Sequence, residues 1–215
     1  MSAALTSLLA FGAAAALLTI TPGLDTALVL RTAAVEGPRP AWRAALGIVC
    51  GVLAWGLIVA AGLGALLALS TLAYTLLQFA GAGYLCYLGG RMLWTALKAQ
   101  PAAPGGLPQG ANAGGSDWFV RGLLTNLLNP KVGVFYVSLL PQFVPPGADV
   151  FVFSVLLAGV HALMGLLWFA VLIALTGPLA QWLRRPPVVR ALNGVTGAAL
   201  LLFGLRLALA PRPSH

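Results

Sequence analysis

Charged residues are scarce in this chain: only 7% of its 215 residues are Asp, Glu, Lys or Arg, whereas 60% are hydrophobic. A soluble domain carries about 25% charged residues, so this composition excludes an ordinary soluble protein. Acidic residues are the rarest charged type, with four against twelve basic ones. The composition therefore predicts a membrane protein with almost no soluble part.

Cysteine is also scarce, and the only two, Cys50 and Cys86, lie in apolar stretches without CxxC spacing. Such cysteines are typical of small core residues, so we expect neither a structural disulfide nor a metal site. A membrane redox enzyme of the thiol-relay type would need a cysteine at each of the two helix breaks described below. We therefore expect no enzyme activity and no cofactor.

The net charge of +8 does not indicate nucleic-acid binding. The basic residues cluster between apolar stretches, as they do in the cytoplasmic loops of membrane proteins, and they form no free basic face. The first residues lack a basic region, and their apolar run is longer than that of a signal peptide. We expect this segment to be a membrane helix.

Long apolar stretches predict an all-α membrane protein with six transmembrane helices, since one span needs about 20 apolar residues. Residues 44–90 and 150–183 contain no charged residue. The predicted helices cover residues 3–34, 41–69, 72–97, 118–143, 150–175 and 189–210. The first and the fourth are each interrupted by a proline.

The helices fall into two similar halves, residues 1–98 and 118–215. Residues 99–117 are rich in Pro, Gly, Ala and Asn and predict a flexible linker. Three pairs of residues occupy equivalent places in the halves: Pro22 and Pro130, Trp55 and Trp168, and Gly89 and Gly204. Because three is odd, consecutive halves have opposite orientations, which predicts a 3+3 inverted repeat.

Basic residues near the helix ends predict the orientation in the membrane. Nine of them would lie on one side: Arg31, Arg39, Arg43, Arg91, Lys98, Arg121, Arg184, Arg185 and Arg190. Two, Arg206 and Arg212, would lie on the other. The nine mark the expected cytoplasmic side, so both termini should face outward.

The first break, at Pro22 and Gly23, has the features of a binding site. Proline removes a backbone donor, and we expect Gly23 to adopt a conformation closed to other residues. Irregular backbone persists at membrane depth only where it lines a cavity or is buried. Its free amides attract an anion and its free carbonyls a cation, which suits an amino-acid zwitterion. The alternative is a simple kink.

Asp25, beside this break, is the only acidic residue inside a predicted span. An ionisable residue at membrane depth is a functional hypothesis by default. Asp25 could carry a proton from outside to inside, or it could bind a substrate ammonium. The alternative is a structural ion pair with Lys131.

The second break carries Asn126, Asn129, Pro130 and Lys131. Asparagine side chains can both donate and accept hydrogen bonds in a dry site. Lys131 could hold a substrate carboxylate or pair with Asp25. The alternative is that the asparagines satisfy carbonyls freed by the proline.

Other residues are secondary candidates. His161 could relay protons, although a lone histidine is more often a packing residue, and Thr21, Tyr136 and Gln142 could line or gate a pocket. Some glycines are expected to allow close helix approach instead: Gly47, Gly51, Gly56, Gly81 and Gly159.

Ordered motifs run through most of the chain: Thr21-Pro22-Gly23-Leu24-Asp25, Ala45-Leu46-Gly47-Ile48, Ala80-Gly81-Ala82-Gly83-Tyr84-Leu85, residues 119–131, and Pro141-Gln142-Phe143-Val144. As a set they resemble the LysE/RhtB family of bacterial amino-acid exporters. The resemblance implies export across the bacterial inner membrane, driven by the proton gradient, with Asp25, Asn129 and Lys131 as motif residues. The family often has a second proline after the glycine, where this chain has Leu24.

We therefore expect a secondary transporter that exchanges a small zwitterionic or cationic amino acid, or a derivative, for protons. The expected site comprises Pro22, Gly23, Asp25, Asn126, Asn129, Pro130 and Lys131. Its partners would be the amino acid, protons, the lipid bilayer and a second copy of the chain, and both termini would be periplasmic. Two alternatives stay open, a metal-ion exporter, for which one Asp and one His are few ligands, and a non-transporting membrane scaffold.

Overall fold

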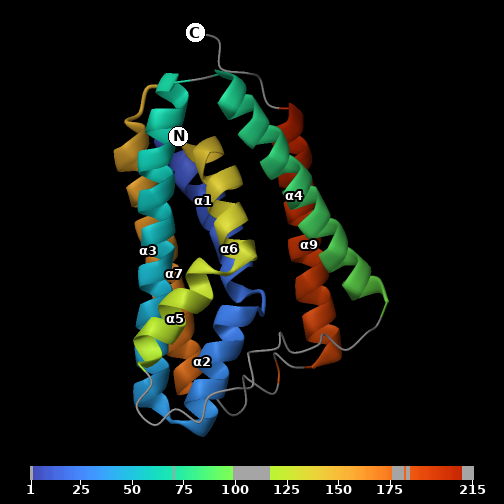
Figure 1. The fold of residues 1–215 in the computed structure, drawn as a ribbon. Helices are drawn as coiled ribbons and strands as arrows, with labels where there is room; N and C mark the ends of the chain where they lie inside the picture. Colours follow the sequence, from blue (N-terminus) through green and yellow to red (C-terminus); the bar gives the residue numbers. More distant parts are fainter. Residues whose placement is uncertain (1, 70, 99–116, 176–181, 183–184, 210–215) are drawn as a thin grey trace.

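The structure, a computed structural model, describes residues 2–69, 71–98, 117–175, 182 and 185–209. Figure 1 shows a bundle of helices, and the described residues contain no strand. The predicted all-α class is thus confirmed for this part of the chain. Apart from Asp117, the predicted linker at 99–117 lies outside the described residues.

The first half contains a broken helix followed by two long ones. The elements are α1 (Ala3–Ile20), α2 (Leu24–Val35), α3 (Pro38–Leu69) and α4 (Thr71–Leu97). Gly37 connects α2 to α3 with a φ of 94°, a left-handed conformation that favours glycine. Its amide donates to the Thr32 carbonyl at 3.1 Å, which satisfies one of the free carbonyls at the end of α2.

The second half contains another broken helix followed by two unbroken ones. The elements are α5 (Trp118–Leu127), α6 (Pro130–Val134), a π-helical turn η1 (Phe135–Leu139), a 3₁₀ turn η2 (Leu140–Phe143), α7 (Val150–Ala174) and α9 (Pro186–Leu209). Aspartates cap two of these helices, because Asp117 accepts from the Phe119 amide at 2.9 Å and Asp149 from the Val152 amide at 2.8 Å.

The predicted fourth helix differs from the structure beyond its proline break, because η1 and η2 replace a regular α-helix. Pro141 has no amide to donate, so the regular hydrogen-bond ladder cannot continue through this residue. A π-turn of this kind is common at functional sites. Here it contains Tyr136, which is fully buried.

Helices α1, α3, α7 and α9 are long and apolar enough to cross a membrane. Segment 118–127 and segment 130–143, bent by 51° at the second break, make a fifth span if they are counted as one. The chain is therefore a multi-pass membrane protein. The predicted third span, α4, is not among these, although it runs beside α9 along the edge of the bundle (Figure 1).

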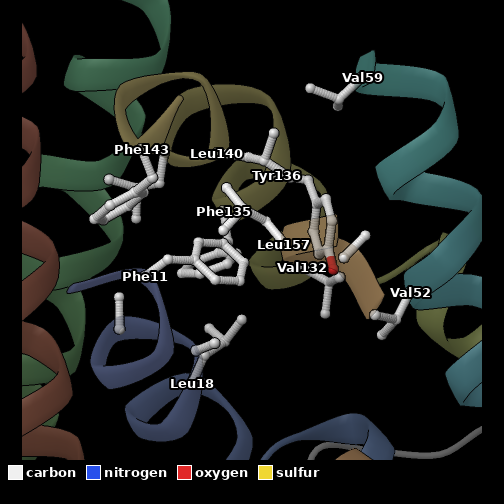
Figure 2. Packing of buried hydrophobic residues seen from close by; sticks show 14 of the residues in the cluster. Phe11, Leu18, Val52, Val59, Val132, Phe135, Tyr136, Leu140, Phe143 and Leu157 are labelled. Carbon is white, nitrogen blue, oxygen red and sulfur yellow. The ribbon is translucent and has the colours of Figure 1, made fainter. Parts of the chain in front are cut away.

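The largest core cluster joins the two halves. It includes Phe11 and Leu18 of α1, together with Phe135 and Tyr136 of η1. Figure 2 shows side chains from α1, α3, α6, η1 and η2 turned toward one another in this cluster. The core therefore fixes the position of α1 relative to the segment that follows the second break.

Glycines allow several helices to approach closely, as predicted. A Cβ added at Gly47, Gly51, Gly56 or Gly81 would come closer than 3.0 Å to an atom of a neighbouring helix or turn. The prediction is wrong for Gly159, because it is exposed and a Cβ there would meet nothing within 4 Å.

Replacing Gly89 with valine is expected to lower the melting temperature in detergent by forcing α4 and α9 apart. A Cβ at Gly89 would lie 2.6 Å from the carbonyl oxygen of Gly197 on α9, and overpacking costs about 1–3 kcal/mol. Gly90→Val is the matched control, because a Cβ there would meet nothing within 4 Å. Equal melting temperatures for the two variants would contradict the close contact.

Candidate binding site at the two helix breaks

The first break leaves the backbone extended between α1 and α2. Thr21 ends α1 with φ −65° and ψ 118°, and Gly23 precedes α2 with φ −153° and ψ −164°. This Gly23 conformation is open to any residue, so the prediction of a glycine-only backbone is wrong. A Cβ at Gly23 would instead lie 3.9 Å from the Lys131 Nζ atom, which places this glycine against the second break.

The second break is organised by the asparagine that precedes its proline. The Asn129 side-chain oxygen accepts from the Lys131 amide at 3.1 Å and caps α6, in which Pro130 is the first residue. Asn129 thus satisfies an amide, not a carbonyl freed by the proline. The Asn126 amide nitrogen does not bind such a carbonyl either, because it donates to Asp25 at the first break.

Each break binds a side chain that comes from the other. The Lys131 ammonium donates to the carbonyl oxygens of Leu18 at 3.1 Å and Thr21 at 3.2 Å, at the end of α1. In return, the Asn126 Nδ2 atom donates to the Asp25 Oδ2 atom at 2.8 Å. These contacts join residues more than 100 positions apart and hold the two breaks together.

Asp25 and Lys131 do not form the direct ion pair that the sequence left open as an alternative. The Asp25 carboxylate accepts from the Asn126 amide, and the Lys131 ammonium donates to two backbone carbonyls. The two groups are nevertheless close enough to interact electrostatically. One acid and one base therefore lie side by side without neutralising each other through a shared hydrogen bond.

A cavity of about 50 Å³ lies between the breaks. Its polar wall contains Thr21, Gly23, Asp25, Asn126, Asn129 and Lys131, and its apolar wall includes Ile48, Val49 and Val52 of α3 with Ala162, Gly165 and Phe169 of α7. A water molecule needs roughly 10–15 Å³ of such space, so the cavity has room for a few waters. The predicted site residues, Pro22 and Pro130 excepted, line it directly.

Two buried acceptors at this site have no hydrogen-bond partner, the Asp25 Oδ1 and the Asn126 Oδ1 atoms. A buried acceptor left unsatisfied costs about 1–3 kcal/mol. Both atoms belong to residues that line the cavity. The Asn126 Oδ1 atom faces Gly51 of α3, because it lies 2.7 Å from where a Cβ of that glycine would stand. The Asp25 Oδ1 atom is therefore the acceptor at this site that a cationic guest can satisfy.

The secondary candidates fall into two groups. His161 lines the cavity, and its Nδ1 atom lies 3.0 Å from the Tyr136 hydroxyl, with the two rings stacked at 5.7 Å between centroids. Thr21 also lines the cavity. Gln142 does not, because its side-chain amide donates to the Ser138 carbonyl at 2.8 Å within the η1–η2 segment.

Sequence reasoning missed several residues at the site. Thr19 and Thr26 line the cavity, and buried Thr196 of α9 exchanges a hydrogen bond with the Thr21 hydroxyl. Threonines are enriched around the first break, at positions 19, 21 and 26. This local enrichment is a sequence signal that could have identified Thr19 and Thr26. Nothing in the sequence marks Thr196, whose partner lies 175 positions away.

Among the described residues, no group of three His, Cys, Asp or Glu side chains lies close enough to hold a metal ion. The ionisable side chains that line the cavity are Asp25, Lys131 and His161. The site is thus built from one carboxylate, one ammonium, one imidazole, amides and hydroxyls.

Comparison with known proteins gives matches over most of the chain. The family model described as LysE type translocator matches residues 16–210. An uncharacterized membrane protein of Bacillus subtilis (strain 168), YrhP, is 30% identical over 210 residues, covering 95% of this chain and 99% of that protein. The threonine efflux protein of Escherichia coli (strain K12) is 33% identical over 196 residues, covering 89% and 92%.

A third relative is the homoserine/homoserine lactone efflux protein of Salmonella typhimurium, 31% identical over 194 residues, covering 90% of this chain and 92% of that protein. No solved structure matches the chain.

Proposed function

Because the chain belongs to the LysE type translocator family, the LysE/RhtB family, we propose that it is a secondary transporter that exports small amino acids or their derivatives. Relatives named for the efflux of threonine and of homoserine support this activity. The structural observation that carries the proposal is the pair of opposite charges at the cavity, each supplied by a different broken helix.

The cavity offers a partner for each charged group of an amino acid. The Asp25 Oδ1 atom has no protein partner and is the proposed acceptor for the α-ammonium. The Lys131 ammonium has three donors, of which two reach carbonyls, so the third can donate to the α-carboxylate. A zwitterion bound in this way uses both charges of the site.

Transport requires that the site open alternately to the two sides of the membrane. The present cavity is small, about 50 Å³, so an amino acid would require the two halves to move apart. In Figure 1, α1–α2, α3 and α4 run down, up and down, whereas α5–α6, α7 and α9 run up, down and up. This opposite order supports the inverted repeat, an architecture in which one half rocks against the other.

Asp25 is the residue that we propose to couple export to the proton gradient. It would accept a proton on the outer side and release it on the inner side when the amino acid leaves. Its carboxylate lies at the cavity, and its Oδ1 atom has no protein partner. His161 and Tyr136, hydrogen-bonded to each other beside the same cavity, are further candidates for the proton route.

The bacterial inner membrane is the proposed location, with both termini in the periplasm. One end of the bundle holds the start of α1 and the end of α9 (Figure 1). The opposite end holds the ends of α2 and α4, together with the starts of α3, α5 and α9. The second end carries most of the described basic residues, as cytoplasmic ends do. A homodimer stays a prediction.

Reconstitution in liposomes tests this function. Purified protein with an imposed pH gradient should move at least one labelled amino acid from a panel that includes threonine, homoserine, leucine, alanine, lysine and arginine. Dissipating the gradient with an ionophore should reduce the flux, and protein-free liposomes are the control. The proposal fails if no amino acid shows protein-dependent flux, and proton coupling fails if the ionophore has no effect.

A further inference from the structure

Gly165 of α7 differs from the other buried glycines among the described residues. At each of the others, an added Cβ would come closer than 3.0 Å to a neighbouring atom, which explains the glycine by packing. A Cβ at Gly165 would meet only the Phe169 Cε2 atom, at 4.0 Å. Helix packing therefore does not require glycine at this position, although the residue is buried.

The space beside Gly165 is the cavity, which this glycine lines together with Phe169 and Ala162. These three residues belong to α7, and the Ile48, Val49 and Val52 side chains of α3 complete the same wall. The charged wall comes from the two breaks instead. A guest whose ammonium and carboxylate are held at the breaks must place its side chain against the apolar wall.

The charges at the cavity limit which side chain can occupy that position. One aspartate and one lysine line the described cavity, and the α-ammonium and α-carboxylate of the guest use both. The Nδ1 atom of His161 already has the Tyr136 hydroxyl as its partner. A lysine or arginine side chain would place an unpaired charge against apolar residues, and burying such a charge is costly.

Building on the proposed transport function, we propose that the apolar wall is the side-chain subsite, that it accepts neutral side chains, and that Gly165 sets the largest side chain it admits. The missing Cβ leaves room that a larger residue at position 165 would fill. Substitution should therefore exclude large substrates before small ones.

The test compares substrate panels for wild type, Gly165→Ala and Gly165→Val in proteoliposomes. The panel contains alanine, threonine, leucine, phenylalanine, lysine and arginine. For the largest neutral amino acid that wild type carries, flux relative to alanine should fall at least tenfold in Gly165→Val and less in Gly165→Ala. Wild type should carry lysine and arginine at least tenfold more slowly than its best neutral substrate.

Gly159→Val is the matched control, because Gly159 lies on the same helix, is exposed and does not line the cavity. Its substrate ratios should equal those of wild type. Melting temperatures in detergent check that each variant folds, and Gly165→Ala adds only one methyl group to open space.

Two outcomes overturn the inference while leaving the transport function intact. One is a Gly165→Val variant that is folded and keeps the wild-type substrate ratios, or that loses all substrates in equal proportion. The other is lysine or arginine flux as fast as that of neutral amino acids. Absence of flux for every amino acid would instead overturn the transport function itself, and the subsite with it.

Discussion

Asp25→Asn should abolish gradient-driven export while leaving the protein folded. The asparagine keeps the side-chain shape and an oxygen that can accept from Asn126, so the contact between the breaks persists. It removes the negative charge and the site of protonation. Losing a charge that pairs with the substrate ammonium should weaken binding at least tenfold, about 1.4 kcal/mol, and proton coupling should vanish altogether.

The measurement is amino-acid flux in proteoliposomes with and without a pH gradient, with the melting temperature recorded for each variant. Glu36→Gln is the matched control, since Glu36 is an exposed acidic residue at the end of the same helix. It should transport like wild type. Flux through Asp25→Asn that still responds to the gradient would rule out the coupling role.

Lys131→Met is expected to have the second largest effect, on both transport and stability. Methionine has a similar length but cannot donate, so the Leu18 and Thr21 carbonyls lose their partner. A buried group left without its partner costs about 1–3 kcal/mol. The substrate carboxylate also loses its cation, so we expect at least a tenfold weaker binding and a lower melting temperature.

Lys98→Met provides the control, because Lys98 is exposed and its ammonium lies 4.0 Å from the centre of the Trp94 ring. The double variant Asp25→Asn with Lys131→Met separates a functional pair of charges from a structural one. If the charges served only to balance each other, removing both would restore transport. We expect the double variant to stay inactive, and restored flux would contradict the proposed site.

Some features of the fold follow from local sequence because their causes are local. Prolines at positions 22 and 130 cannot donate in a helix ladder, and the structure breaks both helices there. Long apolar runs also predict spanning helices locally, because the length and hydropathy of a run do not depend on distant parts of the chain. The η1–η2 segment was not predicted, although Pro141 contributes to it, because a proline specifies where a helix changes but not how the backbone compensates.

The sequence identifies which residues belong to the candidate site, but it does not indicate which of them contact one another. Asp25 and Lys131 stand out in the sequence because each is a charged residue inside an apolar stretch. A direct ion pair was one alternative, whereas the structure gives each of them a neutral partner from the other break. Nothing in the sequence around Gly165 distinguishes it from the glycines that serve helix packing.

The sequence by itself determined the membrane environment, the positions of both helix breaks and the charged residues beside them. These depend on hydropathy and on the covalent structure of proline, which are properties of short segments. Only the tertiary structure decided that the two breaks face each other, that Thr196 reaches Thr21, and that Gly165 borders the cavity. Such contacts join segments far apart in the chain, and their geometry is fixed by how the whole bundle packs.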